Sequence, residues 1–219
     1  MEKKDLIAHS PVRYFDNATS AGLKDGEMGL VTAKKGLGKT SVLVQFGIDS
    51  LLNDKALVHV SFDQQSSNVI AWYSSIMAEV AKKKNINLDE VSEEIVRNRT
   101  ILNFNQETFT LPKVVNTLKA LKEGGIKIGS VVVDGLDLGK TSKADLDCFA
   151  DFVKAEKMTA WFSYTNEAAD LKGTLDADKL ADFATVGHLA ASGNALSLTI
   201  LKNGDGKANL DAKTLLFTK

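Results

Sequence analysis

The segment that most constrains this chain is a glycine- and lysine-rich turn between two apolar stretches. Residues 28–32 form a continuous hydrophobic run typical of a buried strand, and residues 40–52 carry apolar side chains at helical spacing. A strand-to-helix loop of this kind directs backbone N–H groups and the positive end of a helix dipole toward one point. The turn therefore predicts a binding site for a polyphosphate.

The residue types in the turn indicate which polyphosphate it binds. The loop matches the pattern G-x-x-x-x-G-K-[ST], except that Ala33 stands at the first glycine position. Lys39 is placed to reach the β- and γ-phosphates of a nucleotide, and the Thr40 hydroxyl is placed to ligate Mg²⁺. We expect ATP and Mg²⁺ as cofactors. The predicted nucleotide-binding residues of the loop are Ala33, Lys34, Lys35, Gly36, Leu37, Gly38, Lys39, Thr40 and Ser41.

A carboxylate farther along the chain suits the same ligand. Ser130 to Val133 form a second apolar run of strand type, and Asp134 follows it directly. In proteins with a phosphate loop, an acid at a strand end holds the Mg²⁺ ion through water. Asp134 is therefore predicted, with Thr40, as a metal-binding residue.

Apolar runs and helical patterns alternate along the rest of the chain. Strands are predicted at 56–62, 101–104, 130–133 and 159–164, and helices from about 68, from 110 to 124, after 142, and over 176–185. This alternation predicts right-handed crossovers and a mainly parallel sheet covered on both faces, which is a three-layer α/β sandwich. The runs 195–201 and 210–217, joined by an Asn-Gly-Asp-Gly turn, predict a C-terminal antiparallel hairpin.

Length and composition set limits on the organisation of the chain. The 219 residues, 44% of them hydrophobic, suit a single domain over 1–219, and the net charge of −1 offers no strong field to attract nucleic acid or an anionic membrane. No apolar stretch is long enough to span a bilayer or to act as a signal peptide. Cys148 lies among apolar residues at helical spacing, and we expect a core thiol in a cytoplasmic protein.

From Leu23 onward the chain resembles the RecA-like P-loop ATPases, in particular the group that holds the circadian-clock ATPase KaiC, the recombinase RadA and the helicase DnaB. The resemblance rests on the phosphate loop, on the segment 22–28 before the first strand, and on the acid-bearing segment 130–138. It covers nearly the whole chain and implies a RecA-like fold that binds ATP. It also implies assembly into a homo-oligomer, either a hexamer or a dimer.

The resemblance assigns roles to further residues. In the family, a glutamate after the second strand polarises the attacking water, and the matching residue here is Asp63, one methylene shorter. Gln64 could position that water instead, and Lys39 completes the predicted catalytic set. The strand after the metal-binding acid ends in polar residues that sense the γ-phosphate in the family, and Asn166 is our choice among Ser163, Thr165 and Asn166.

Two further assignments come from family analogy. The family places the adenine pocket near the chain ahead of the first strand, where Arg13 and Phe15 are candidates. Basic residues near the last hairpin reach a neighbouring subunit's nucleotide in the family, and Lys202 stands at that place.

Four functions are open at this stage. The favoured one is a KaiC-type slow ATPase or nucleotide-dependent switch, because the short side chain of Asp63 weakens hydrolysis. A dimeric ATPase is the second, because Lys34 occupies the place of the signature lysine in the MinD and ParA ATPases. A non-hydrolysing nucleotide-binding scaffold is the third. A DNA recombinase or helicase-type motor is the fourth, and it is not favoured because acidic residues crowd the region after Asn166.

Overall fold

The computed structural model describes residues 3–20, 22–84, 93, 95–168, 171 and 174–219. Within these residues the strands form one sheet in the order β3-β2-β4-β5-β1-β6-β7-β8-β9. The first six strands pair in parallel, and β7, β8 and β9 are antiparallel to their neighbours. The strand bounds are β1 Met28–Ala33, β2 Ala56–Ser61, β3 Arg99–Asn103, β4 Ile128–Asp134, β5 Thr159–Thr165, β6 Phe183–Ser192, β7 Ala195–Lys202, β8 Lys207–Leu210 and β9 Phe217–Thr218.

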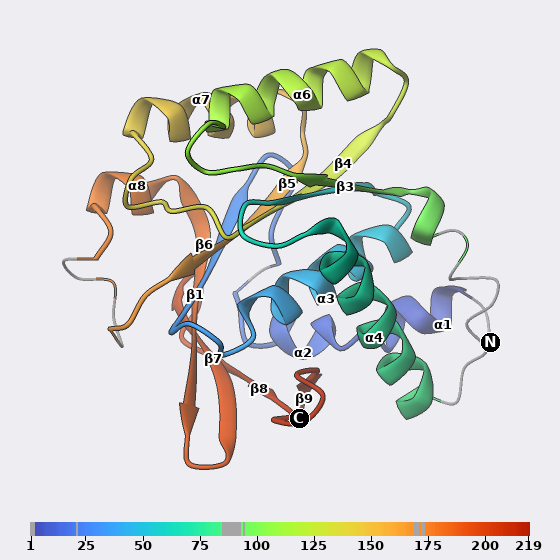
Figure 1. The fold of residues 1–219 in the computed structure, drawn as a ribbon. Helices are drawn as coiled ribbons and strands as arrows, with labels where there is room; N and C mark the ends of the chain where they lie inside the picture. The colour runs from blue at the N-terminus through green and yellow to red at the C-terminus, as the bar shows by residue number, and fades with distance from the viewer. Residues whose placement is uncertain (1–2, 21, 85–92, 94, 169–170, 172–173) are drawn as a thin grey trace.

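Helices cover the sheet on both faces, as Figure 1 shows. One face carries α6 and α7, and the other carries α3 and α4 together with the two short N-terminal helices. The bounds are α1 Lys3–Ala8, α2 Val12–Asp16, α3 Lys39–Leu52, α4 Ser66–Lys84, α6 Leu111–Glu123, α7 Lys143–Ala155 and α8 Ala177–Ala181. The predicted three-layer α/β sandwich with a mainly parallel sheet is confirmed.

Local sequence explains where the outer helices begin. Ser142 caps α7, since its side-chain oxygen accepts a hydrogen bond from the Asp145 N–H at 3.1 Å. Thr110 precedes α6, and Pro112 lies in the first turn, where its missing N–H costs no helical hydrogen bond. Each helix buries one stripe, with Leu118 of α6 and Phe149 of α7 fully removed from solvent.

A separate hydrophobic core fills each side of the sheet. The α3 side contains nearly all of the central helix, including Val42, Leu43 and Val44, because α3 is covered by the sheet, α4 and the N-terminal helices. The α6–α7 side is built from the opposite faces of β2, β4 and β5, where Val58, Val131 and Phe162 lie. Strands buried on both faces account for the unbroken apolar runs in the sequence.

The sequence-based prediction missed the strand β6. We expected a helix over 176–185, but α8 ends at Ala181 and β6 begins at Phe183 and pairs in parallel with β1. Alanine, glycine and histidine within β6 give it weak strand propensity, and its central place in the sheet overrides that preference. The C-terminal antiparallel hairpin is confirmed as β7 and β8, but the predicted second strand over 210–217 is wrong. That strand spans 207–210, and residues 211–216 form a turn that leads into β9.

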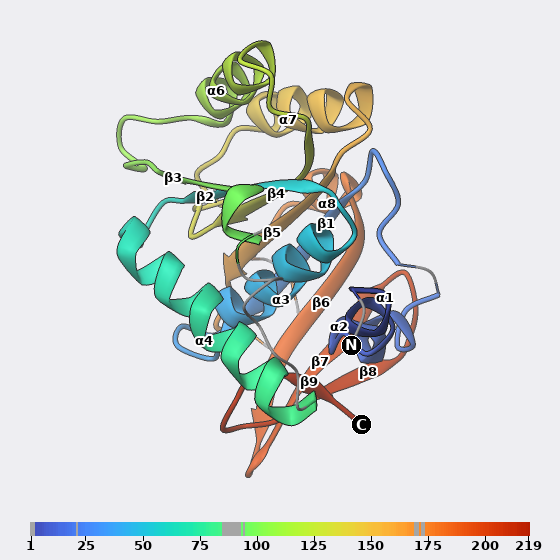
Figure 2. The same cartoon turned by 90° about the vertical axis from the view of Figure 1, so that its right-hand side faces the viewer.

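The helix α2 packs against the C-terminal strands. It contacts both β8 and β9, beside which it lies in Figures 1 and 2. The Ser20 N–H donates to the Asn203 carbonyl at 2.9 Å, which ties the segment after α2 to the turn after β7. The N-terminal residues thus complete the α3 side of the core, a role that the sequence analysis did not foresee.

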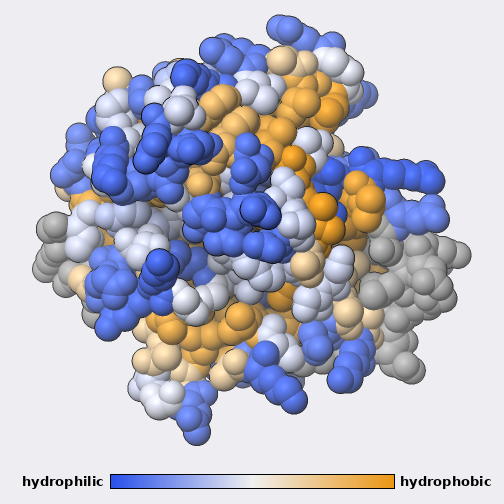
Figure 3. All heavy atoms as spheres, viewed as in Figure 1, coloured by the Kyte–Doolittle hydropathy of each residue, from blue (hydrophilic) through white to orange (hydrophobic). Residues whose placement is uncertain are grey.

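The exposure of Cys148 corrects one prediction made from the sequence. Cys148 is exposed on α7, so the prediction of a core thiol is wrong: its neighbours Leu146 and Phe149 face the sheet and Cys148 does not. Hydrophilic and apolar side chains are interspersed on the face seen in Figure 3. No helix among the residues that the structure describes is long and apolar enough to cross a membrane.

Candidate nucleotide-binding site

The glycine-rich turn leads from the end of β1 into the first turn of α3. Gly36 and Gly38 both have positive φ, 82° and 97°, and Gly38 is the residue that precedes the helix. A side chain on Gly38 would be strained by this φ and would also meet Leu215, whose Cδ1 lies 3.0 Å from an added Cβ. Ala33 ends β1 without positive φ and is fully buried, so alanine fits the first position of the motif.

The backbone of the turn offers free hydrogen-bond donors. In the part of the chain that the structure describes, no acceptor faces the backbone N–H groups of Gly36, Gly38, Lys39, Thr40 or Ser41. The last three belong to the first turn of α3, where a helix leaves its N–H groups without internal partners. These donors and the helix dipole fit an anionic phosphate chain. Phosphate binding by these residues stays a prediction, which the free donors support.

Lys39 points back into the loop. Its Nζ donates to the carbonyl oxygens of Ala33 at 3.4 Å and of Lys34 at 3.3 Å, long contacts that an anion could replace. Burial lowers the pKa of Lys39, while the carboxylates of Asp134, Asp63 and Glu167 act to raise it. Three carboxylates thus face one ammonium group, and the excess of negative charge suits a divalent cation bound together with phosphate.

Thr40, Asp134 and Ser163 form one hydrogen-bonded group at the carboxyl ends of the parallel strands. The Thr40 hydroxyl donates to Asp134 Oδ2 at 2.7 Å, and the Ser163 hydroxyl donates to Asp134 Oδ1 at 2.5 Å. Burial raises the pKa of Asp134 although both hydroxyls and Lys39 act to lower it. The described residues hold no cluster of three metal-binding side chains. One carboxylate and one hydroxyl still suit Mg²⁺, which keeps several waters and takes phosphate oxygens as ligands.

Asp63 follows β2 and faces the same cavity. A Cβ built on Gly135 would lie 2.4 Å from Asp63 Cγ, so the carboxyl group packs against the bare Cα of Gly135. Burial raises the pKa of Asp63, with a further increase from Asp134, and the hydrogen bond with the Gln64 side chain lowers it. The backbone N–H of Gln64 donates to Ser61 Oγ at 3.1 Å, which fixes the turn that presents both residues.

These groups line one cavity of about 740 Å³. Most of the residues predicted to bind the nucleotide and the metal lie around this cavity. The lining members of that set are Lys35, Gly36, Gly38, Lys39, Thr40, Ser41, Asp63, Gln64 and Asp134. Ala33, Lys34 and Leu37 belong to the same turn without lining the cavity.

Asn166 does not line the cavity. It is buried just after β5, its N–H donates to the Ala33 carbonyl at 2.9 Å, and its Oδ1 accepts from the Ala168 N–H at 3.1 Å. Ser163 and Thr165, the alternatives at this strand end, do line it. The geometry favours these two over Asn166 as residues that meet the γ-phosphate.

Seven lining residues were not predicted as site residues from the sequence: Trp72 of α4, Gln106, Gly135, Leu136, Asp137, Tyr164 and Leu215. Leu215 has a φ of 58°, and Gln45 holds it there by donating to its carbonyl at 2.8 Å and accepting from the Phe217 N–H at 3.0 Å. Contacts across 170 residues leave no signal in a local pattern. In the sequence, Trp72 belongs to the apolar stripe of a predicted helix. Such a stripe predicts a residue buried in the core, not one that lines a cavity.

One assignment from family analogy does not fit the geometry, and the structure of a single chain leaves a second one untested. Arg13 and Phe15 line a different cavity, near the C-terminal end of α3, and so do not form an adenine pocket at the phosphate loop. Lys202 donates to the carbonyls of Leu180 and Ala181 at 3.3 and 3.1 Å, so it satisfies the C-terminal end of α8 in its own chain.

A family model described as "ATPase: KaiC" matches residues 8–188. The chain belongs to the KaiC ATPase family. It is accordingly an ATP-binding RecA-like protein, and the match begins ahead of α2 and ends within β6. No curated protein matches the chain. Membership in the KaiC family agrees with the strand-loop-helix geometry around Lys39 and with the placement of Asp134 at a strand end.

Proposed function

We propose that this KaiC-family protein binds Mg²⁺-ATP at the phosphate loop and acts as a slow ATPase or nucleotide-dependent switch within a homo-oligomer. The observation that carries the proposal is the set of free backbone N–H groups at Gly36, Gly38 and the first turn of α3, with Lys39 in their midst. These groups bind and orient the phosphates, and Lys39 contacts the β- and γ-phosphates.

The metal would be held by the hydrogen-bonded pair of Thr40 and Asp134. The Thr40 hydroxyl would be a direct ligand, and Asp134 would act through water. When bound, Mg²⁺ would neutralise the negative charge on the β- and γ-phosphate oxygens. Ser163 keeps the Asp134 carboxylate in place through its hydrogen bond, so the ligand set is ordered in advance.

In the proposed hydrolysis, Asp63 accepts the proton of the attacking water. The oxygen of water bonds to the γ-phosphorus, the bond from that phosphorus to the β,γ-bridging oxygen breaks, and the proton of water passes to Asp63. Burial and Asp134 raise the pKa of Asp63, which makes its carboxylate a better base. The aspartate side chain ends one methylene short, and a displacement of about 1 Å can cost about a hundredfold in rate. Slow turnover follows, with Gln64 beside Asp63 to hold the water.

Turnover of purified variants tests this assignment. Asp63→Glu should raise the rate of ATP hydrolysis at least about tenfold, because it restores the reach of the base. Asp63→Asn should remove hydrolysis while ATP still binds. Asp137→Asn is the matched control, since Asp137 is another carboxylate that lines the cavity and it should leave turnover near the wild-type value. Wild-type turnover in Asp63→Asn would refute the role, and a chain inactive in every form would be a non-hydrolysing scaffold.

The oligomer is tested separately by measuring molar mass in solution with and without Mg²⁺-ATP. A hexamer is the expected state of the KaiC-type switch. An ATP-dependent dimer that Lys34→Ala abolishes would instead support the MinD and ParA type of ATPase, because Lys34 is exposed on the loop. DNA binding that weakens steeply with salt would support the motor function.

A further inference from the structure

The loop between β3 and α6 reaches the phosphate-loop cavity, where Gln106 forms part of the lining. The strand β3 that precedes this loop lies at the edge of the sheet, beside β2. The proposed chemistry assigns the phosphates, the metal and the attacking water to other residues. The place of Gln106 at the cavity therefore has a different explanation, which its contacts supply.

Both polar atoms of the Gln106 side chain bind the backbone of one turn. Nε2 donates to the Gly135 carbonyl at 2.8 Å, and Oε1 accepts from the Asp137 N–H at 3.0 Å. The amide group thus bridges the two ends of the turn 135–137, much as a neighbouring strand would. Glutamine suits this place, because an ionised carboxylate of the same length could not donate to the Gly135 carbonyl.

The turn 135–137 sets the place of Asp63. Gly135 directly follows Asp134, and its N–H donates to Ser163 Oγ at 2.9 Å while its carbonyl accepts from the Gln106 amide. Both polar groups of Gly135 are therefore held. Its bare Cα lies against the Asp63 carboxyl group, where an added Cβ would stand 2.4 Å from Cγ. A shift of the turn would thus move Asp63 by direct contact.

The loop after β3 is itself held in a fixed shape. The rings of Phe104 and Phe109 stack at its base, with centroids 3.7 Å apart and an interplanar angle of 7°. The Phe109 N–H donates to the Asn105 carbonyl at 3.0 Å, which closes the loop on itself. The Asn103 side chain donates to the Gln64 carbonyl. The loop is therefore joined to the turn after β2 as well as to the turn after β4.

We propose that Gln106 is a positioning residue for ATP hydrolysis, which holds the turn 135–137 and thereby keeps Asp63 and Asp134 in their relative places. The inference rests on the proposed function, because it concerns how Asp63 is presented to the attacking water. Gln106 acts through the backbone of the turn and takes no proton.

Gln106→Met tests this role, because methionine keeps the length of the side chain and lacks the amide group. A displacement of about 1 Å can cost about a hundredfold in rate, so a partial shift of the turn should lower kcat for ATP hydrolysis about tenfold. The Kd of Mg²⁺-ATP should stay within about twofold, because the groups that bind the phosphates are unchanged. Glu107→Gln alters the exposed neighbour in the same loop and should leave both values near wild type.

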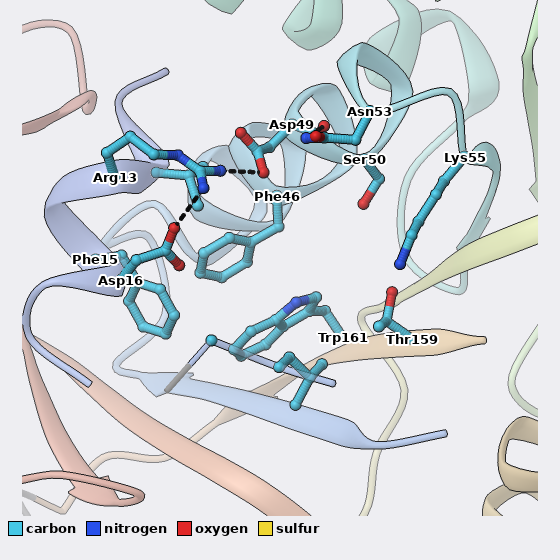
Figure 4. A pocket seen from close by; sticks show the side chains of 13 residues that line it. Arg13, Phe15, Asp16, Phe46, Asp49, Ser50, Asn53, Lys55, Thr159 and Trp161 are labelled. Carbon is cyan, nitrogen blue, oxygen red and sulfur yellow. Dashed lines mark hydrogen bonds and ion pairs between the residues drawn. The ribbon is translucent and has the colours of Figure 1, made fainter. Parts of the chain in front are cut away.

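Two further measurements separate positioning from a general loss of stability. Hydrogen exchange of the Asp137 N–H, followed by NMR without nucleotide, should be about tenfold faster in Gln106→Met, because this N–H has lost its acceptor. Arg13 pairs with Asp49 at 2.5 Å beside a second cavity of about 460 Å³, near the C-terminal end of α3 (Figure 4). Asp49→Asn weakens this ion pair, so it should lower the unfolding temperature and leave kcat unchanged.

Several results would overturn the positioning role. Wild-type kcat or unchanged exchange at Asp137 in Gln106→Met would show that turnover or the turn does not depend on this side chain. An equal loss of kcat in Asp49→Asn would show that turnover follows stability alone. A loss of Mg²⁺-ATP affinity as large as the loss of kcat would make Gln106 a nucleotide contact. No turnover by the wild type would instead refute the proposed hydrolysis, and this inference with it.

Discussion

The Asp63 carboxyl group lies against the bare Cα of Gly135, so that a Cβ at Gly135 would stand 2.4 Å from Asp63 Cγ. Gly135 directly follows Asp134 at the end of β4, and Asp63 follows β2, the neighbouring strand. The contact therefore fixes the distance between the proposed base and the proposed metal-binding acid. Gly135 also has a φ of 79°, which a side chain would strain.

Gly135→Ala should accordingly destabilise the fold and displace Asp63. We expect the free energy of unfolding to fall by about 2 kcal/mol or more, from steric overlap added to the cost of positive φ. Gly125→Ala is the matched control, since Gly125 has a φ of 98° with nothing within 4 Å of an added Cβ. Urea unfolding measures both, and an equal loss in the two variants would contradict the contact with Asp63.

Removal of the metal should weaken ATP binding through Thr40. In the wild type we expect ATP affinity to fall about tenfold or more when EDTA replaces Mg²⁺. Thr40→Val keeps the shape of the side chain but loses the hydroxyl, so its ATP affinity should be low and should change little with Mg²⁺. Thr40→Ser keeps the hydroxyl and should keep the Mg²⁺ dependence. Isothermal titration measures all three, and a full Mg²⁺ effect in Thr40→Val would refute the ligand role.

Glu167 places a negative charge beside the phosphate loop. Its Oε1 accepts from the Lys35 N–H at 3.4 Å, and its charge acts on Lys39. Glu167→Gln should tighten ATP binding two- to fivefold, with a larger gain at low salt, because the side chain is exposed and its repulsion is screened. Glu123→Gln, at the end of α6, should have no effect. An unchanged affinity in Glu167→Gln would show that the charge is fully screened.

The parallel core of the fold could be read from the sequence because its signals are local. The apolar runs that became β1, β2, β4 and β5 are buried on both faces, and the phosphate loop and Asp134 follow from strand ends that share one edge of the sheet. The strand β6 was missed because its residues have weak strand propensity. Its place beside β1 depends on pairing between segments about 155 residues apart.

The candidate site likewise contains residues that local patterns predicted and residues that only contacts between distant segments place there. The turn around Lys39 and the strand-end acid were predicted, whereas Leu215 reaches Gly38 only because Gln45 binds the C-terminal segment. Arg13 and Phe15 were placed at the nucleotide by analogy, and the structure puts them at the other end of α3. Position along the chain says little about which end of a helix a distant segment covers.

His59 makes stability depend on pH. It is fully buried on β2, where burial and the charge of Arg99 lower its pKa from 6.5 to about 3. Below pH 6.5 the unfolded chain binds a proton that the folded chain does not. As the pH falls from 6.5 toward 3, this residue therefore lowers the free energy of unfolding by about 1.4 kcal/mol for each pH unit. In His59→Gln, urea unfolding between pH 7.5 and 5 should no longer show this part of the pH dependence of the free energy of unfolding. His9→Gln, at an exposed residue, should keep it, and equal slopes in wild type and His59→Gln would contradict the account.

The central claim is that the loop around Lys39 binds the phosphates of ATP, and the most direct test is isothermal titration of Mg²⁺-ATP into Lys39→Ala. We expect at least about a hundredfold loss of affinity, because the variant removes the cation that lies among the free loop N–H groups. Lys35→Ala removes a neighbouring, exposed lysine and should lose only a few-fold. Wild-type affinity in Lys39→Ala, or no ATP binding by the wild type, would contradict the claim.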